Sequence, residues 1–433
     1  MKHQQQKPQS TRRTFLKTTG GALAAGTAAP GLAAMSNPHV AGEDLIRVGL
    51  IGCGGRGTGA ATQALNADDN VKLVAMGDAF GDRLTSSLER IQRSPELAAK
   101  VDVPPERQFV GFDAYKDVIA NVDVVLLTTP PHFRPAHLKE VIDQGKHCFV
   151  EKPVAVDAPG IRSIIETCKQ AKEKNLSIVS GLCYRYHHGR RAILNEIHEG
   201  RIGDIVALHV DYVTGALWSH PRQQAWSDME YQMRNWLYYT WLSGDHIAEQ
   251  HIHSLDVMAW AMQDKYPTSA YSLGGRQVRT EPIFGHIYDH FANIYEWDSG
   301  VKGFSYCRQQ KQCFRQTNDF VLGSKGRANV FRHQIEGPNE WSLGRLPRGH
   351  NMYQNEHDEM FAAIRAGNPI NDNGDYMWRS TLMAIMGRMA AYTGQRITWD
   401  QALASEENLS PRSYEWGPIA TPDVALPGIT QFV

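Results

Sequence analysis

The stretch Ile46-Arg47-Val48-Gly49-Leu50-Ile51-Gly52-Cys53-Gly54-Gly55-Arg56-Gly57 decides how the first half of this chain folds. Its apolar start is typical of a buried strand, and the strand leads directly into the pattern G-x-G-x-x-G. In such a turn Gly52 permits the tight bend, Gly54 lets the backbone approach a pyrophosphate, and Gly57 lets the following helix pack closely. The expected dinucleotide contacts in the turn are Gly52, Gly54, Gly55, Arg56 and Gly57.

A carboxylate follows the next apolar run. Val71-Lys72-Leu73-Val74-Ala75-Met76-Gly77 ends at Asp78, about twenty residues beyond the turn, where an acid binds the adenosine ribose hydroxyls of a dinucleotide. A lone G-x-G-x-x-G also occurs in ordinary glycine-rich loops, but the strand before it and the acid after it favour a dinucleotide site. Because Asp78 would repel a 2′-phosphate, we expect NAD rather than NADP, although the Arg56 guanidinium would suit a 2′-phosphate.

Two further strand ends lie on the same edge of the predicted sheet. Short apolar runs alternate with helical stretches from Leu45 to Pro153, as in βαβ units. Val122–Thr129 stops at Pro130-Pro131, and Cys148–Val150 leads into Glu151-Lys152-Pro153. Ligands of doubly wound sheets bind outside the carboxyl ends of the strands, so we expect Lys152 beside the nicotinamide half of the dinucleotide. The cofactor contacts expected at this edge are Thr129, Pro130, His132, Glu151 and Lys152.

The pattern of the chain changes after residue 178. Ile205–Tyr212, Gly300–Tyr306 and Asp319–Gly323 alternate apolar and polar residues, which is typical of an antiparallel sheet with one solvated face. The sequence therefore predicts an α/β protein: an N-terminal Rossmann dinucleotide-binding domain, followed by an α+β domain with a large, mostly antiparallel open sheet. We place the Rossmann domain at residues 45–178, the α+β substrate and oligomerisation domain at 179–400, and a C-terminal tail at 401–433.

A stretch rich in titratable side chains, Gly244–Asp256, is predicted to begin a helix of the second domain. Glu249 and His253 are four residues apart and would share one face, with Asp256 a further turn along it. A carboxylate one turn from a histidine orients the imidazole and raises its basicity, as a proton-transfer site requires. The alternatives are a capped surface helix and a zinc site. The apolar neighbours favour a packed helix, and the spacing matches neither H-E-x-x-H nor H-x-x-E-H, so we expect no metal.

Aromatic residues are concentrated between positions 218 and 241. Aromatic ring faces suit the C–H surfaces of sugars, and Asn and Tyr supply directional hydrogen bonds. The same residue types also suit a core or a subunit interface, and the sequence does not separate these alternatives. The group comprises Trp218, Trp226, Asn235, Trp236, Tyr238, Tyr239 and Trp241.

Charge and cysteine content exclude several classes of protein. The 45 basic residues nearly balance the 46 acidic ones, so there is no electrostatic case for a nucleic-acid partner or an anionic membrane surface. The six cysteines form no C-x-x-C pair, and Cys53 and Cys148 fall in the glycine turn and in a predicted strand. We therefore expect buried free thiols rather than a disulfide framework.

The first residues of the chain match an export signal. Thr11-Arg12-Arg13-Thr14-Phe15-Leu16-Lys17 fits the twin-arginine pattern, and the weakly apolar stretch Thr18–Ala34 follows it. The alternative is a disordered Ala/Gly arm with a chance arginine pair. We expect residues 1–34 to be a twin-arginine signal peptide, and the mature protein to be periplasmic or otherwise exported by that route. The stretch is too short and too interrupted by Gly and Pro to span a membrane.

Together these motifs resemble the glucose-fructose oxidoreductase, inositol dehydrogenase and MocA (Gfo/Idh/MocA) family. The resemblance rests on the glycine turn, Glu151-Lys152-Pro153, the acid and histidine of the predicted helix, and a later turn at Gly323-Ser324-Lys325-Gly326. It runs from about Leu45 to Trp399, which is nearly the whole chain after the predicted signal peptide.

The resemblance implies roles for individual residues. Lys152 would lie near the nicotinamide and the substrate hydroxyl, and His253 would transfer a proton. Glu249 would orient His253 from a position where the family usually has aspartate. Tyr184-Arg185-Tyr186 resembles an arginine-bearing segment of the family near the substrate pocket. The expected catalytic residues are Lys152, His253 and Glu249, and the expected substrate contacts are Arg185, Tyr186, Trp236, Tyr239 and Asp256.

The resemblance also implies a function. We expect an NAD(H)-dependent oxidoreductase that acts on a carbinol of a sugar, cyclitol or glycoside, as a homodimer or homotetramer. Outside the cytoplasm no free NAD pool would reoxidise a released cofactor, which favours a tightly bound one. The first alternative is an NAD-dependent glycosidase, in which transient oxidation at C3 acidifies the C2 proton and elimination expels the aglycone. The second is a non-catalytic ligand-binding protein of the same fold, which the presence of Lys152 and His253 argues against.

Overall fold

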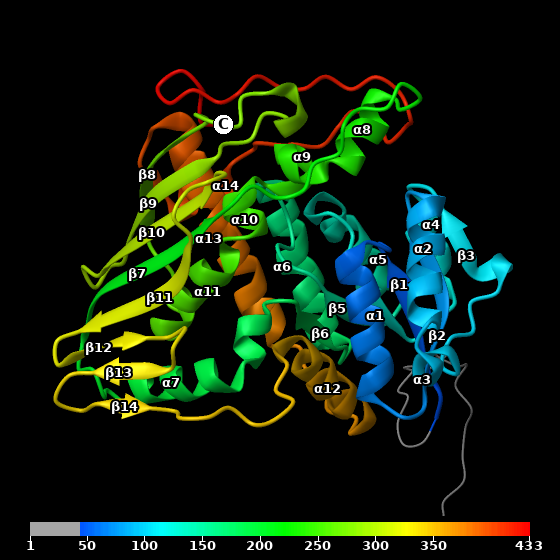
Figure 1. The fold of residues 1–433 in the computed structure, drawn as a ribbon, viewed down its shortest axis with the longest axis horizontal. Coiled ribbons are helices and arrows are strands. Elements are labelled where there is room, and N and C mark those ends of the chain that lie inside the picture. The colour runs from blue at the N-terminus through cyan, green and yellow to red at the C-terminus, as the bar shows by residue number, and fades with distance from the viewer. Residues whose placement is uncertain (1–43) are drawn as a thin grey trace, which may run out of the picture. The chain divides into compact units, whose positions relative to one another are not determined.

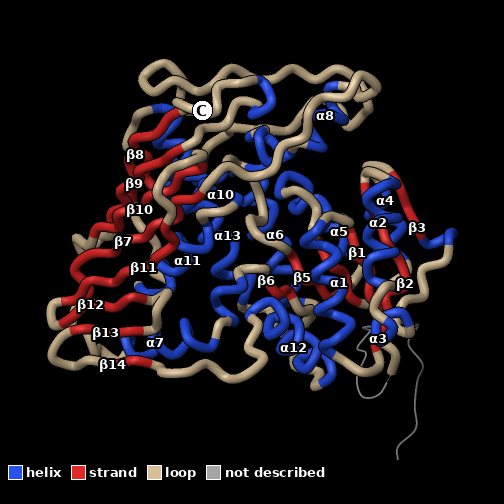
Figure 2. The backbone as a smooth tube through the Cα atoms, viewed as in Figure 1, coloured by secondary structure: helices blue, strands red, loops and turns tan. Residues whose placement is uncertain are grey.

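Two sheets organise residues 44–433, the part of the chain that the computed structural model describes (Figures 1 and 2). One sheet has six strands and comes first in the sequence, and the other has nine. The signal peptide predicted at residues 1–34 lies outside the described residues.

The first sheet has the strand order β3-β2-β1-β4-β5-β6, and all of its neighbouring strands are parallel. Parallel strands need crossover helices, which cover both faces and make the strands apolar throughout. Helices α1 and α2 pack on one face, and α4, α5 and α6 pack on the other. The predicted Rossmann fold is therefore confirmed. The strands are β1 (Ile46–Ile51), β2 (Val71–Asp78), β3 (Gln108–Val110), β4 (Val124–Leu127), β5 (His147–Val150) and β6 (Ile178–Ser180), and the helices are α1 (Gly55–Ala67), α2 (Gly81–Gln92), α3 (Pro95–Ala98), α4 (Ala114–Ala120), α5 (Arg134–Asp143) and α6 (Ala158–Glu173).

The second sheet has the order β14-β13-β12-β11-β7-β10-β9-β8-β15. Its neighbouring strands are antiparallel except for β7 and β10. Buried and more exposed residues alternate along β9 and β10, so one face packs on helices and the other does not. This confirms the predicted second sheet. Its strands are β7 (Ile205–Thr214), β8 (Ser269–Gly275), β9 (His290–Glu296), β10 (Lys302–Gln309), β11 (Gln316–Gly323), β12 (Gly326–Asn329), β13 (Gln334–Glu336), β14 (Trp341–Ser342) and β15 (Ile397–Thr398).

The helix α13 packs against elements of both sheets. It is buried over most of its length. It contacts β6 of the first sheet and the helix α6, and it also contacts β8 of the second sheet and the helices α10 and α11. The preceding helix, α12, packs on α1 of the Rossmann fold. The later half of the chain therefore supplies one wall of the region beside the glycine turn. The remaining helices are α7 (His188–His198), α8 (Asp228–Arg234), α9 (Thr240–Ser243), α10 (His246–Glu249), α11 (Ile252–Ala261), α12 (Met352–Arg365), α13 (Asn373–Thr393) and α14 (Trp399–Ala404).

Two further observations concern residues 44–433. All six cysteines are free thiols and five of them are buried, as the cysteine spacing predicts. Among the helices of residues 44–433, none is long and apolar enough to cross a membrane.

Candidate active site

The glycine turn forms an open cradle at the carboxyl end of β1. Gly52 has a φ of +95°, and a Cβ there would lie 2.6 Å from the backbone nitrogen of Thr129, so the bend requires glycine. A Cβ on Gly57 would lie 1.9 Å from the Gly52 carbonyl oxygen, whereas a Cβ on Gly54 or Gly55 would meet nothing within 4 Å among the described residues. This open backbone at the start of α1 fits a pyrophosphate, whose charge a helix N-terminus favours.

Asp78 lies at the end of β2 and borders the same cavity as the cradle. Its Oδ2 accepts a hydrogen bond from the backbone nitrogen of Cys53 at 2.6 Å, and its Oδ1 accepts one from that of Phe80 at 2.9 Å. Burial raises the pKa of this carboxyl, and the two backbone N–H groups act against the rise. The bonds hold Asp78 beside the turn, where it can bind the adenosine ribose of NAD.

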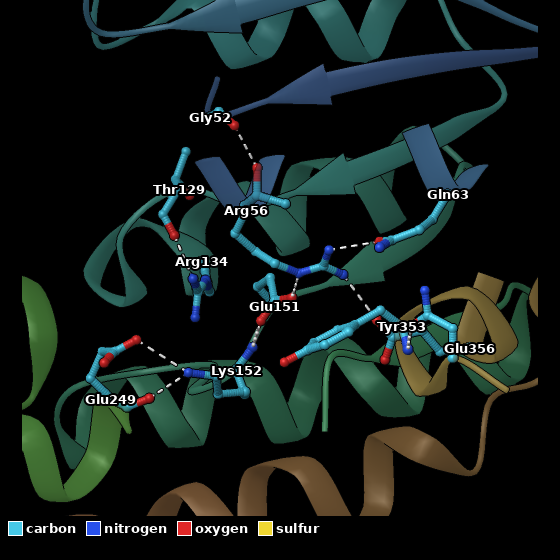
Figure 3. Close-up of polar contacts among 12 residues, drawn as sticks. Gly52, Arg56, Gln63, Thr129, Arg134, Glu151, Lys152, Glu249, Tyr353 and Glu356 are labelled. Atoms are coloured by element: carbon cyan, nitrogen blue, oxygen red, sulfur yellow. Dashed lines mark hydrogen bonds and ion pairs between the residues drawn. The ribbon is translucent and has the colours of Figure 1, made fainter. Parts of the chain in front are cut away.

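Arg56 is bound by acidic side chains. Its Nε donates to Glu151, and its two terminal nitrogens donate to Glu356 Oε1 at 2.9 Å and to Gln63 Oε1 at 2.7 Å (Figure 3). Glu151 and Glu356 are both buried. A 2′-phosphate would have to displace these partners. Arg56 also borders the cavity with 29% of its side chain exposed, so its contact with the cofactor stays a prediction. Through these bonds Arg56 ties the glycine turn to the Glu-Lys-Pro segment and to α12.

Lys152 follows the end of β5. Its Nζ donates to the backbone oxygen of Glu249 and lies 3.2 Å from Glu249 Oε1 (Figure 3). Only 14% of the Lys152 side chain and 18% of the Glu249 side chain are exposed. The Lys152 backbone nitrogen also donates to Glu151 Oε2 at 3.1 Å. The Arg56–Glu151 pair therefore holds the backbone from which Lys152 extends into the cavity.

His253 lies in the first turn of α11 and borders the cavity together with Lys152. Its side chain is buried, and its ring stacks on Tyr184 with 4.8 Å between the ring centroids. Burial, together with the nearby charge of Lys152, holds the pKa of the imidazole well below 6.5. His253 is therefore neutral at neutral pH and can accept a proton.

The helix that the sequence predicts over Gly244–Asp256 is interrupted. It forms two helices, α10 and α11, and Gln250 lies between them with φ −110° and ψ −50°. The argument from four-residue spacing requires an unbroken helix, so the expected pairing of Glu249 with His253 does not form. The Glu249 carboxylate contacts Lys152 instead, and the pKa of His253 is lowered rather than raised. All three side chains still border one cavity.

Asp256 and Arg185, two expected substrate contacts, pair with each other outside the cavity lining. Arg185 bonds both oxygens of Asp256, with two of the contacts at 2.9 Å, and bonds Asp264 at 2.6 Å. Asp256 is fully buried and also accepts from Ser380 Oγ at 2.7 Å. A buried charge needs such partners, so these side chains stabilise the interior of the second domain.

Three other side chains that were expected to contact the substrate or the cofactor contact other residues of the protein instead, and none of them lines the cavity. Tyr186 OH donates to Asn373 Oδ1 at 2.8 Å, and Tyr239 is buried in a hydrophobic cluster. His132, expected to bind the cofactor, is bonded through Nε2 to Tyr414 OH at 2.8 Å. Buried polar groups find internal partners in folded proteins, and the sequence did not show which partners these would be.

The aromatic residues between 218 and 241 divide between the cavity and the core. Trp218 and Trp236 border the cavity, with 6.1 Å between the centroids of their rings. Asn235 is buried and exchanges hydrogen bonds with the backbone of His220, which also borders the cavity. Trp218 and Trp236 therefore lie where a ligand could contact them, and their role in sugar binding stays a prediction. Trp226 borders a small adjoining hollow, and the members packed in the core are Tyr238, Tyr239 and Trp241.

These groups share a cavity of about 690 Å³. Arg134, which the sequence did not single out, borders it and donates to the Thr129 carbonyl oxygen at 2.6 Å, and burial lowers the pKa of Arg134 to about 10. Arg134 follows a predicted strand end, so the strand-end argument extends to it. In residues 44–433 no cluster of His, Cys, Asp and Glu is arranged to hold a metal ion. Other cavity residues missed by the sequence are Phe80, Arg83, Phe112, Tyr212, Gln250 and Tyr353.

Comparison with known proteins gives two kinds of similarity. Residues 46–179 match the Gfo/Idh/MocA family, described as an oxidoreductase family with an NAD-binding Rossmann fold. The chain is 27% identical over 225 residues to a glycosyl hydrolase family 109 protein of Shewanella pealeana, which is 48% of this chain and 47% of that protein. It is 23% identical to the 2,7-anhydro-N-acetylneuraminate hydratase of Escherichia coli over 59% of this chain and 60% of that protein. The chain thus spans about half the length of the curated relatives it matches.

The second similarity is structural and extends beyond the Rossmann fold. The myo-inositol 2-dehydrogenase of Lactobacillus plantarum aligns with a TM-score of 0.63 over 82% of this chain and 99% of that one, at 19% identity. The shared feature is the fold. Residues 46–179, which match the NAD-binding Rossmann fold of the Gfo/Idh/MocA oxidoreductase family, are also the part of the chain that carries the glycine cradle and Asp78.

Proposed function

We propose that this protein is an NAD(H)-dependent oxidoreductase that acts on a carbinol of a sugar, cyclitol or glycoside and keeps its cofactor bound. The observation that carries the proposal is that Lys152, Glu249 and His253 border the cavity into which the glycine turn opens. The cradle, with Asp78 beside it, fits the dinucleotide. NAD bound there supplies a hydride acceptor at its nicotinamide.

The protein's own residues divide the proton chemistry between them. Lys152, held by Glu249, presents a positive charge that binds and polarises the substrate hydroxyl oxygen. His253 is neutral, so its imidazole accepts the hydroxyl proton when the carbinol is oxidised and returns it in the reverse direction. Glu249 acts by positioning Lys152. The burial of these side chains keeps bulk water from the reacting oxygen.

The outer wall of the cavity supports a carbohydrate substrate. Trp218 and Trp236 supply apolar ring surface, and His220 and Gln250 supply polar groups beside it. The Gln250 side chain is oriented by a hydrogen bond of 2.9 Å that its Oε1 accepts from Gln309. Aromatic surface with a few directed polar groups is what a sugar or cyclitol requires.

A glycosidase that regains its starting redox state in each turnover is the second candidate. It is favoured by the similarity to the glycosyl hydrolase family 109 protein of Shewanella pealeana and to the E. coli hydratase. The same Lys152 and His253 would serve it, because oxidation at C3 of the glycoside would precede loss of the aglycone.

One experiment separates these functions. The purified protein is incubated with a panel of sugars, cyclitols and glycosides while reduced nicotinamide and released aglycone are measured. A dehydrogenase accumulates reduced nicotinamide, whereas the glycosidase releases aglycone without net reduction. The Lys152→Ala variant is the control, because it removes the amine and leaves the cradle in place. Tight NAD binding with neither signal would favour a non-catalytic ligand-binding protein.

We also propose export by the twin-arginine route and assembly into a homodimer or homotetramer. Export is supported by Arg12 and Arg13, and assembly by the sheet face that helices leave uncovered. Replacing both arginines by lysine should leave the precursor in the cytoplasm on cell fractionation. Light scattering of the purified protein measures the assembly.

A further inference from the structure

Residues 405–433 have neither helix nor strand, yet hydrogen bonds fix them at both ends. Ser405 Oγ and the Glu406 backbone nitrogen both donate to the backbone oxygen of Val433, so the start and the end of the segment meet. The buried Arg388 of α13 pairs with Glu407. We call residues 405–433 the C-terminal loop. Figure 1 shows it in red, passing α8.

The middle of the C-terminal loop contacts the Rossmann domain through two aromatic side chains. Tyr414 OH bonds His132 Nε2 at 2.8 Å, and the Tyr414 ring lies 5.8 Å from the Phe112 ring. The Trp416 ring lies 4.6 Å from the Phe112 ring and 5.2 Å from the Phe80 ring, measured between centroids. The loop therefore rests on two rings that follow strand ends of the first sheet.

Those two rings border the cavity at its adenosine end. Phe80 lies two residues after Asp78 and donates its backbone N–H to the Asp78 carboxylate. Phe112 and Phe80 both line the cavity, whereas Tyr414 and Trp416 pack behind them. The C-terminal loop is thus the outer layer of the wall around the ribose-binding carboxylate.

Directly after Trp416 the loop is bonded to α8. The Gly417 carbonyl oxygen accepts from the Met229 backbone nitrogen at 3.0 Å. Gln232 Nε2 donates to the carbonyl oxygens of Ile419 at 3.4 Å and Ala420 at 3.3 Å. The adjacent Met233 borders the cavity. The stretch 414–420 therefore joins the Rossmann side of the cavity wall to the side that α8 supplies.

We propose that the C-terminal loop is part of the dinucleotide site and slows release of the cofactor by holding the adenosine wall closed. The inference rests on the proposed function, because it requires NAD in this cavity. An adenosine bound at Asp78 leaves when the walls bordered by Phe80 and Phe112 separate, and the contacts of Tyr414 and Trp416 must break for this to happen. Tyr414 is 44% exposed and Trp416 is 45% exposed, so they contribute to the wall more than to the core.

The test compares the rate of NAD release from the wild-type protein and from two variants. The double variant Tyr414→Ala/Trp416→Ala removes both rings from the wall. The matched control is Phe314→Ala, which removes a ring that is 71% exposed and lies outside the cavity lining. Each protein is loaded with NAD and mixed with excess isotope-labelled NAD, and exchange is followed over time. The NAD content of each freshly purified protein is measured by acid extraction.

We expect the double variant to exchange NAD about 10- to 100-fold faster than the wild type, because two aromatic contacts are lost. It should also retain less NAD through purification, while Phe314→Ala matches the wild type in both measurements. Equal exchange in all three proteins overturns the inference and leaves the proposed function standing. A wild type that binds no NAD overturns the proposed function itself. If the double variant does not fold, the single variant Trp416→Ala replaces it, because it removes the ring that contacts both Phe80 and Phe112. Unchanged exchange in that variant overturns the inference.

Discussion

The buried imidazole of His253 sets the pH range of the proposed proton transfer. Its pKa lies well below 6.5, because burial and the Lys152 charge disfavour the protonated form. A base must be neutral to accept a proton, so activity should persist as the pH falls through 6.5 and decline only below the lowered pKa. We expect kcat/KM to show no acid limb between about pH 6 and 7, the usual histidine range. A limb centred there in the wild-type pH profile would contradict a neutral His253.

Two neighbouring histidines should respond differently to substitution. His253→Ala should lower kcat by about 10²- to 10⁴-fold, the usual size of a general acid–base contribution, and leave the Kd for NAD unchanged. His251 is buried against the sheet, with its Nε2 2.6 Å from Ser305 Oγ. His251→Ala should therefore lower Tm and spare kcat. Steady-state kinetics, NAD calorimetry and thermal unfolding of both variants distinguish these effects, and a reversed pattern would rule out the site assignment.

At the level of elements, a buried ion pair joins α12 to α1. Arg56→Ala would leave Glu356, which is fully buried, without its cation. Removing one partner of a buried pair costs about 3–5 kcal/mol. Burial raises the pKa of Glu356, so its protonation should limit the loss to the lower end of that range. Because Arg56 also holds Glu151, kcat should fall with stability.

The matched control is a second ion pair to α12, formed by Arg191 of α7. Arg191 pairs with Glu359 of α12 at 2.7 Å, but 37% and 38% of the two side chains are exposed. Exposed pairs contribute less than about 1 kcal/mol, so Arg191→Ala should change the free energy of unfolding little. Both variants are compared by denaturant unfolding. Equal losses in the two variants would show that burial does not set the strength of the Arg56 pair.

The elements also show which features a sequence can predict. The glycine turn and Asp78 were predictable because their chemistry is local: a strand, a tight bend and an acid at the next strand end. The break between α10 and α11 carries no such local signal. Arg185 and its partner Asp256 are 71 residues apart, and Arg56 and Glu356 are 300 residues apart. Periodicity places such residues on an element, but only tertiary packing decides which partner satisfies them.

Across the whole molecule, buried neutral histidines should make the fold sensitive to mild acid. Burial lowers the pKa of His137 and His251 to about 3, and that of His132 and His286 to about 4. In the unfolded chain these imidazoles are protonated as the pH falls through about 6.5, whereas in the folded chain they stay neutral. The free energy of unfolding is therefore highest above pH 6.5 and decreases as the pH falls below it. At about pH 5, each of these histidines should have lowered the free energy of unfolding by about 2 kcal/mol.

Thermal unfolding between pH 7 and pH 5 tests this balance. The buried Asp319 acts in the opposite direction, because burial raises its pKa to about 6 and its protonation favours the folded state. Because several histidines oppose the effect of this one carboxyl, we expect Tm to fall as the pH is lowered. A constant or rising Tm would mean that these histidines are protonated in the folded protein.

Residues from the domains of both sheets line the cavity. We propose that Lys152 and His253 act there on a substrate carbinol beside bound NAD. Rapid mixing tests this claim most directly: NAD-loaded protein is mixed with pooled sugars, cyclitols and glycosides, and the absorbance of reduced nicotinamide is followed through the first turnover. The first turnover reveals hydride transfer whether the net reaction is dehydrogenation or glycoside cleavage. We predict a burst with the wild type and none with Lys152→Ala/His253→Ala, which should still bind NAD. A burst of equal size in the double variant, or substrate conversion by the wild type without any burst, would contradict the claim.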